Sequence, residues 1–388
     1  MIPKSNWPEY DSLIKKNILN ILKTGKTNYL NGKEGIKFEK NFSKFYKIKF
    51  ANTVANASLG LELSLVSLNL DKGSEVIVTP RSYYSSVSCI IRAGLKPVFA
   101  DIDPISMNIS PVSIEKKITK KTKVILCVHL YGMPCDMPKI KNISKNYKLK
   151  IIEDCSQAHG SKIGNKYVGS FGDISVFSFC QDKILSTGGE GGMIGTNNKN
   201  LYEKIWSLKD IGKNRKKYLN INYSFNNFPY VHDSIGTNAR MTEIQSCIGN
   251  YQLNKLKDYI KIRNKNANFY SQRLKNCKAL IIPKLTKYIT HSFYRYTIIL
   301  NNKSIKRSLL MKNLKKRNIS CSVGGCPTIY NEKYFREKYQ IRKNNLANSE
   351  YLKDKTISFL VDQTITKKQI FKVCEILLDE IKKLNKFK

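Results

Sequence analysis

Between about residues 50 and 200, short runs of β-branched and other apolar residues alternate with longer stretches whose apolar residues recur at helical spacing. Strands are expected at 75–79, 97–101, 124–128, 150–153 and 174–179. Helices are expected at 59–68 and at 84–93, the second ending before Gly94. Strands that alternate with helices are typical of a mostly parallel sheet, and continuous apolar runs indicate strands covered on both faces. The chain is therefore expected to adopt an α/β fold.

The pattern changes after about residue 240. The stretch 244–276 reads as one long, lysine-rich helix, and 293–300 reads as a strand between helical segments. We therefore expect a large α/β domain at residues 1–250, with an N-terminal arm, and a smaller α+β domain at 251–388. Since no long Gly/Ser/Pro linker separates them, the two parts are expected to pack tightly.

The charge of the chain is strongly positive: 68 Lys and Arg oppose 29 Asp and Glu, a formal net charge of +39. Such a surplus is compatible with a nucleic-acid partner, but the basic residues are spread along the whole chain, whereas nucleic-acid footprints are usually clustered. Abundant Lys, Asn and Ile also favour AT-rich coding as the cause. No nucleic-acid partner is expected, and the surplus would attract a phosphorylated small molecule in either case.

The spacing of the cysteines and the hydropathy of the chain indicate the cellular compartment. The ten cysteines include no Cys-x-x-Cys pair, and the four histidines lack metal-ligand spacing, so we expect free thiols in a reducing compartment and no metal site. No apolar run approaches the roughly 18–20 residues of a membrane span, and the first residues show no secretory signal. A cytoplasmic protein without a membrane partner is expected.

The first candidate site segment is 54–61, where small and polar residues end a strand-like run and open a helix. Exposed amides at a helix N-terminus bind anions, and Ser58 adds a hydroxyl. An ordinary helix cap without a ligand is the alternative.

The second segment is 151–160, in which Glu153 and Asp154 end an apolar strand. Ligands of open α/β sheets bind beyond the carboxyl ends of the strands. Asp154 could hold a protonated ring nitrogen there, and Gln157 could reach the same ligand. The alternatives are a helix cap for Asp154 and simple packing for His159.

The third segment, 178–193, is the most specific. Lys183 follows the strand end at Ser178 by five residues and precedes a glycine-rich turn. A lysine in a crowded pocket can form a Schiff base. An anion-binding helix start, an acid for a ring nitrogen and a Schiff-base lysine are together what pyridoxal phosphate requires.

These segments, in their order and spacing, resemble the DegT/StrS-type nucleotide-sugar aminotransferases, which are fold type I among pyridoxal-phosphate enzymes. The likeness extends from about residue 28 to 366. It implies a large domain with a mixed, mostly parallel seven-stranded sheet between helices, and a smaller α+β C-terminal domain.

The resemblance also implies roles for individual residues. Lys183 matches the lysine that holds the cofactor and later moves a proton, and Asp154 matches the acid that pairs with the pyridinium nitrogen. Gln157 matches the residue beside the phenolic oxygen of the ring. Burial and the ring cation are expected to lower the pKa of Lys183 toward neutrality.

Further matches concern the phosphate and the ring face. Ser178, Ser58 and the amide of Leu59 match phosphate ligands. Tyr83 matches an aromatic that stacks on the ring, with packing at a helix start as its alternative. Asn238 matches an asparagine that reaches the neighbouring subunit's cofactor phosphate, which implies a homodimer with shared active sites. A local helix cap is its alternative.

The implied reaction moves the amino group of L-glutamate to a nucleotide-linked keto-6-deoxy sugar, for surface-glycan biosynthesis such as that of O-antigen or lipopolysaccharide. The best substrate expectation is a dTDP- or UDP-4-keto-6-deoxyhexose aminated at C4. Amination at C3 and a non-catalytic, cofactor-binding regulator are the alternatives. Dehydratases of the family carry His in place of the lysine, so Lys183 argues against that activity. The looser matches at 323–330, which lines the sugar pocket in the family, and 359–363 leave the sugar open.

Overall fold

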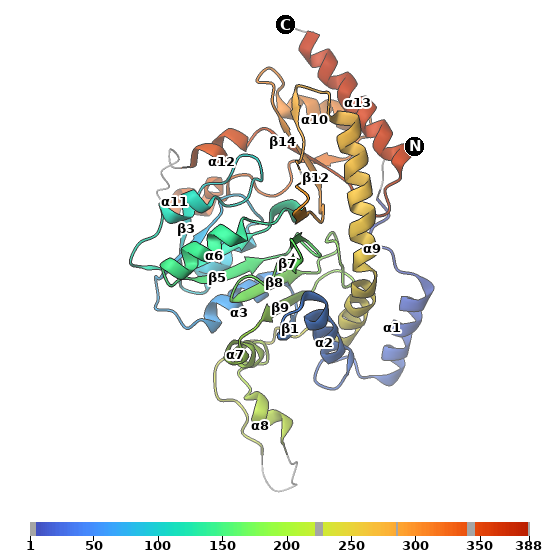
Figure 1. The fold of residues 1–388 in the computed structure, drawn as a ribbon. Coiled ribbons are helices and arrows are strands. Elements are labelled where there is room, and N and C mark those ends of the chain that lie inside the picture. Colours follow the sequence, from blue (N-terminus) through green and yellow to red (C-terminus); the bar gives the residue numbers. More distant parts are fainter. Residues whose placement is uncertain (1–4, 222–227, 285, 340–345, 387–388) are drawn as a thin grey trace.

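A computed structural model describes residues 5–221, 228–284, 286–339 and 346–386 (Figure 1). At its centre lies a seven-stranded sheet of order β1-β9-β8-β5-β4-β2-β3. The strands are β1 (Phe50–Val54), β2 (Glu75–Val78), β3 (Lys96–Phe99), β4 (Thr122–Val128), β5 (Lys150–Asp154), β8 (Ile174–Ser178) and β9 (Gly192–Thr196). Only the pairs β1–β9 and β8–β9 are antiparallel. The expected mixed, mostly parallel seven-stranded sheet is thus confirmed.

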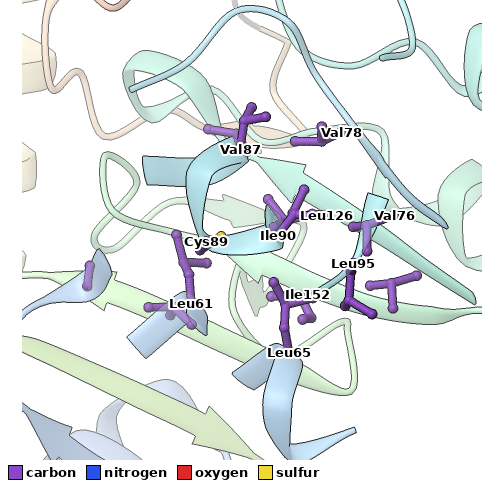
Figure 2. Close-up of a cluster of buried hydrophobic side chains, with 14 of the residues drawn as sticks. Leu61, Leu65, Val76, Val78, Val87, Cys89, Ile90, Leu95, Leu126 and Ile152 are labelled. Atoms are coloured by element: carbon purple, nitrogen blue, oxygen red, sulfur yellow. The ribbon is translucent and has the colours of Figure 1, made fainter. Parts of the chain in front are cut away.

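One face of the sheet is covered by α3 (Ala57–Ser67), α4 (Ser85–Arg92) and α7 (Lys199–Lys209). Figure 2 shows this core, in which Leu61 and Leu65 of α3 and Ile90 of α4 lie over the apolar residues of β2, β4 and β5. These side chains are at most 1% exposed, so each contributes about 1.5–3 kcal/mol of hydrophobic stabilisation. The packing fixes the carboxyl ends of the central strands relative to α3 and α4.

The opposite face is covered by α2 (Glu34–Tyr46), α5 (Pro111–Glu115), α6 (Met137–Asn146) and α9 (Glu243–Leu274). A ring cluster joins α2 to the sheet: Phe42 stacks on Tyr46 and lies edge-on to Phe177 of β8. Helices on both faces explain why the central strands read as continuous apolar runs.

The C-terminal part contains a four-stranded antiparallel sheet of order β10-β12-β14-β13. Its strands are β10 (Leu280–Ile281), β12 (Tyr296–Leu300), β13 (Cys321–Ser322) and β14 (Thr356–Phe359), packed with α10 (Arg307–Lys316) and α13 (Lys367–Lys386). α9 begins with a capping box at Thr242 and runs uninterrupted through residue 250. The division of the chain at that residue therefore stays a prediction.

The remaining elements are a small sheet, further helices and two 3₁₀ turns. A small sheet joins β11 (Ile289–Thr290), β6 (Lys162–Ile163) and β7 (Lys166–Tyr167). Short helices are α1 (Ser12–Thr24), α8 (Arg215–Leu219), α11 (Lys333–Lys338), α12 (Ala347–Leu352) and the 3₁₀ turns η1 (Leu130–Gly132) and η2 (Ile329–Asn331). Of the helices within the described ranges, none is both long and apolar enough to cross a bilayer. All ten cysteines are free thiols.

Candidate active site

A cavity of about 640 Å³ lies at the carboxyl ends of β5 and β8, beneath a wall from the C-terminal part of the chain. Six of the eight residues proposed from sequence line it: Ser58, Tyr83, Asp154, Gln157, Ser178 and Lys183. Ser322, Gly324, Gly325, Tyr294 and Arg295 complete the wall from the other side. Residues up to about 270 positions apart in sequence thus meet in one place.

Asp154 is the last residue of β5, and only 4% of its surface is exposed. Ser86 donates a hydrogen bond of 2.8 Å from its hydroxyl to Oδ2, and the amide of Ser156 donates one of 3.1 Å to Oδ1. The hydroxyl of Ser86 also lies 2.8 Å from that of Ser82. Two donors therefore fix the orientation of a carboxylate that lines the cavity.

Lys183 lies in the turn after β8, with its side chain mostly buried. Its Nζ is 3.7 Å from Oδ1 of Asp182 and 4.8 Å from the ring centre of Tyr294, whose hydroxyl donates to Asp182. Burial alone would lower the pKa of Lys183, but the charge interactions with Tyr294 and Asp182 raise it above its ordinary value. The lowered pKa that the resemblance implies concerns Lys183 beside a bound, buried cofactor and stays a prediction.

Three further predicted residues have suitable surroundings. Gln157 is buried and accepts a hydrogen bond of 2.8 Å from the amide of Tyr131. Tyr83 is 66% exposed and presents its ring to the cavity, and Ser58 lies 2.6 Å from the Ser85 hydroxyl at the start of α3. These groups remain available to a ring and a phosphate.

Leu59 and Asn238 do not line the cavity. The amide of Leu59 donates 3.0 Å to the side chain of Asn56, which caps α3, so the helix-cap alternative describes this amide. Asn238 is exposed and forms an isolated bridge with Asp210. Their roles toward a phosphate stay predictions.

Sequence reasoning missed several residues of the site. Ser86 lies in the first turn of α4 and Ser82 in the segment before that helix, and no regular spacing in the sequence marks the two as neighbours of Asp154. No local signal could have found Tyr294 and Arg295, because only tertiary packing brings β12 to the turn of Lys183. The indole of Trp7 likewise donates 2.7 Å to the Lys183 carbonyl.

Glycine is required at one point of the wall. Gly324 has φ of +86°, and a Cβ there would lie 2.2 Å from the hydroxyl oxygen of Tyr131.

His159 packs between Phe177 and Phe179, and burial together with the charge of Lys183 lowers its pKa to about 3. The packing role expected for His159 therefore agrees with its surroundings.

A second cluster lies directly behind Asp154. His129, Glu153 and Cys155 have ligand atoms within 4.8 Å of one another, all buried. Glu153 already accepts hydrogen bonds from His129 and from amides at 169, 171 and 172, and burial keeps the pKa of Cys155 well above its ordinary value. These contacts make the cluster a support for the backbone at Asp154.

The family model of DegT/DnrJ/EryC1/StrS aminotransferases matches residues 8–378. The chain belongs to this aminotransferase family. It is 36% identical to GDP-perosamine synthase of Escherichia coli O157:H7, covering 91% of this chain and 90% of that protein. It is 32% identical to dTDP-3-amino-3,6-dideoxy-alpha-D-galactopyranose transaminase of Aneurinibacillus thermoaerophilus, covering 94% of each.

Solved structures agree with this assignment. The aminotransferase from Psychrobacter cryohalolentis superimposes with a TM-score of 0.94 at 33% identity, over 99% of this chain and 100% of that one. The E. coli GDP-4-keto-6-deoxy-D-mannose-3-dehydratase with bound hydrated PLP does so with a TM-score of 0.88 at 27% identity, over 97% and 98%. This family member is accordingly a fold type I enzyme whose cofactor is pyridoxal phosphate.

The wall of the cavity fits that cofactor chemically. It offers an amine at Lys183, a fixed carboxylate at Asp154, an uncovered aromatic face at Tyr83, and hydroxyls at Ser58 and Ser178. These are partners for an aldehyde, a ring nitrogen, a ring face and a phosphate, in that order.

Proposed function

We propose that the chain transfers the amino group of L-glutamate to a nucleotide-linked keto-6-deoxy sugar. The observation that carries this proposal is the meeting of Lys183 and Asp154 in one cavity of about 640 Å³, whose far wall includes Ser322, Gly324 and Gly325. Membership of the aminotransferase family supports the reaction type.

In this proposal each residue of the cavity has a separate role. Pyridoxal phosphate supplies an aldehyde carbon that accepts the amino group and a ring that withdraws electrons. Lys183 would hold that carbon through its Nζ in the resting enzyme and, once released, would move a proton between the carbons of substrate and cofactor. Asp154, oriented by Ser86, would keep a proton on the ring nitrogen. Tyr83 would stack on the ring, and Gln157 would face its phenolic oxygen.

Phosphate binding in this proposal falls to Ser58, Ser178 and the backbone at Leu59. Asn238 would reach the cofactor phosphate of a second copy, so that two cavities are completed in a homodimer. The exposed apolar residues Phe228 (72%), Tyr230 (85%) and Ile235 (91%), close to Asn238 in sequence, support burial of this segment in an interface. Figure 1 shows the neighbouring α8 extending away from the body of the molecule.

For the acceptor we propose a 4-keto-6-deoxyhexose on dTDP or UDP, aminated at C4, with a cytoplasmic role in surface-glycan synthesis. Similarity to a GDP-perosamine synthase adds GDP to the nucleotides to test. Amination at C3 is the second candidate, favoured by similarity to a transaminase named for a 3-amino sugar. The division into domains 1–250 and 251–388 belongs to the same proposal.

The test is the visible absorbance of the purified protein with pyridoxal phosphate, before and after L-glutamate. We expect a band of lysine-bound cofactor that glutamate bleaches, and no such band in Lys183→Ala. The glutamate-treated protein is then offered dTDP-, UDP- and GDP-linked keto sugars, and the product's amino position is determined by NMR. A band that glutamate leaves unchanged would refute the transaminase and favour the cofactor-binding regulator.

A further inference from the structure

The cavity contains few cations in spite of the strongly basic chain. Among the described residues that line it, Lys183 and Arg295 are the only ones with a positive charge. Three carboxylates share the wall: Asp154, Asp182 and Glu190. Asp154 is held by Ser86 for its role at the ring, and exposed Glu190 contacts the thiol of Cys180 at 3.7 Å.

Arg295 stands immediately before β12 and reaches toward the turn that carries Lys183. Its Nη2 is 3.6 Å from Oδ2 of Asp182, and its guanidinium carbon is 5.0 Å from the ring centre of Tyr294. The side chain is 24% exposed, so the guanidinium is oriented by these neighbours and still reachable by a ligand. Five N–H donors in a planar fork match a carboxylate in two-point geometry.

Asp182 contacts both cations of the cavity, Lys183 and Arg295. Lys183 Nζ is 3.7 Å from one of its oxygens, and Arg295 is 3.6 Å from the other. An amino acid whose amine lies at Lys183 would therefore bring a carboxylate toward Arg295. Because Lys183 itself reacts, Arg295 is the one described cation of the wall that remains to pair with that carboxylate.

We propose that Arg295 binds a carboxylate of the amino-donor amino acid. This inference rests on the proposed function, since it assigns a binding residue to the donor half of that reaction. Arg295 also lines a second cavity of about 590 Å³, whose other lining residues include Met107, Tyr131 and Tyr288. A diphosphate of the acceptor is therefore the competing anion, and the test must separate the two.

The test compares wild type with Arg295→Met, Arg295→Lys and the control Arg273→Met, which removes the same charge from an exposed position on α9. In the glutamate half-reaction, followed by bleaching of the cofactor band, the glutamate concentration at half-maximal rate is expected to rise at least tenfold in Arg295→Met. For Arg295→Lys this concentration is expected to lie between those of wild type and Arg295→Met. For Arg273→Met it is expected to equal that of wild type.

A second readout is independent of turnover. Glutarate, a dicarboxylate without an amine, is titrated calorimetrically into the cofactor-free proteins, and Arg295→Met is expected to bind it at least tenfold more weakly. If Arg295→Met does not fold by circular dichroism, Arg295→Gln and Arg295→Lys carry the same comparison.

The proposal would be overturned if wild type and Arg295→Met had the same half-saturating glutamate concentration and the same affinity for glutarate. So would a change confined to the nucleotide-sugar half-reaction, which would assign Arg295 to the diphosphate. If wild type forms no cofactor band or is not bleached by glutamate, the proposed function fails, and the glutarate comparison alone then decides whether Arg295 binds a carboxylate.

Discussion

Asp182 controls how readily Lys183 gives up its proton, and the size of this control follows from the geometry. The ammonium and carboxylate are 3.7 Å apart, and the Asp182 side chain is 48% exposed. Because of this exposure the solvent dielectric applies, which gives an attraction of about 1 kcal/mol. That energy corresponds to about 0.7 unit in the pKa of Lys183. The substitution Asp182→Asn is therefore expected to lower this pKa by about 0.7 unit.

The measurement follows the cofactor band after cofactor-free protein is mixed with pyridoxal phosphate between pH 7 and 9. Only the free amine attacks the aldehyde, and the pKa of Lys183 lies above this range in the cofactor-free chain. The logarithm of the rate is therefore expected to rise by about one per pH unit. The line for Asp182→Asn is expected to lie about fivefold higher at each pH.

Asp258→Asn is the matched control, because it removes the same charge from an exposed position on α9. Rates of Asp182→Asn that coincide with those of wild type and of this control would refute the electrostatic argument. A slower Asp182→Asn would show instead that the carboxylate positions Lys183 more than it retains its proton.

Two further predictions concern buried polar contacts. Ser86→Ala removes the 2.8 Å hydrogen bond to Asp154 and is expected to weaken cofactor binding by about 1.5 kcal/mol, or about tenfold, in a spectroscopic titration; unchanged affinity would show that Ser86 does not support the carboxylate. Glu39→Gln removes the carboxylate 2.9 Å from the fully buried Lys209 ammonium and is expected to cost about 3–5 kcal/mol in urea unfolding, with partial recovery when Lys209→Met is added. Additive losses in the double variant would contradict a coupled pair.

The central sheet could be predicted because its parallel strands are buried on both faces and so carry continuous apolar runs. For β1 the sequence indicated only a strand-like run that ends near residue 54, and β9 was not predicted at all. β9 reads Gly-Met-Ile-Gly-Thr, and glycine usually weakens a strand. Here the glycines have a packing reason: a Cβ on Gly195 would lie 2.5 Å from the Ile48 side chain. Close packing of this kind has no periodicity for a sequence to display.

In the candidate site, too, one part could be predicted from the sequence and another part could not. Asp154 ends β5 and Lys183 lies in the turn after β8, where the fold exposes side chains to ligands, so their positions could be predicted locally. The surroundings of Lys183 could not, because Tyr294 comes from the segment before β12, 111 residues later, and acts through packing. The lowered pKa of Lys183 that the resemblance implies concerns the cofactor-bound site and stays a prediction.

The far wall of the cavity also sets the order of events during protein synthesis. Gly324 and Gly325 are added 141 and 142 residues after Lys183. At roughly 5–20 residues per second, the ribosome needs on the order of 7–28 s to make that stretch. Throughout this interval the nascent chain already contains the reactive lysine and its acid partner but not the far wall of the cavity. The complete pocket therefore forms only after residues 322–325 have been made and have docked against the large sheet.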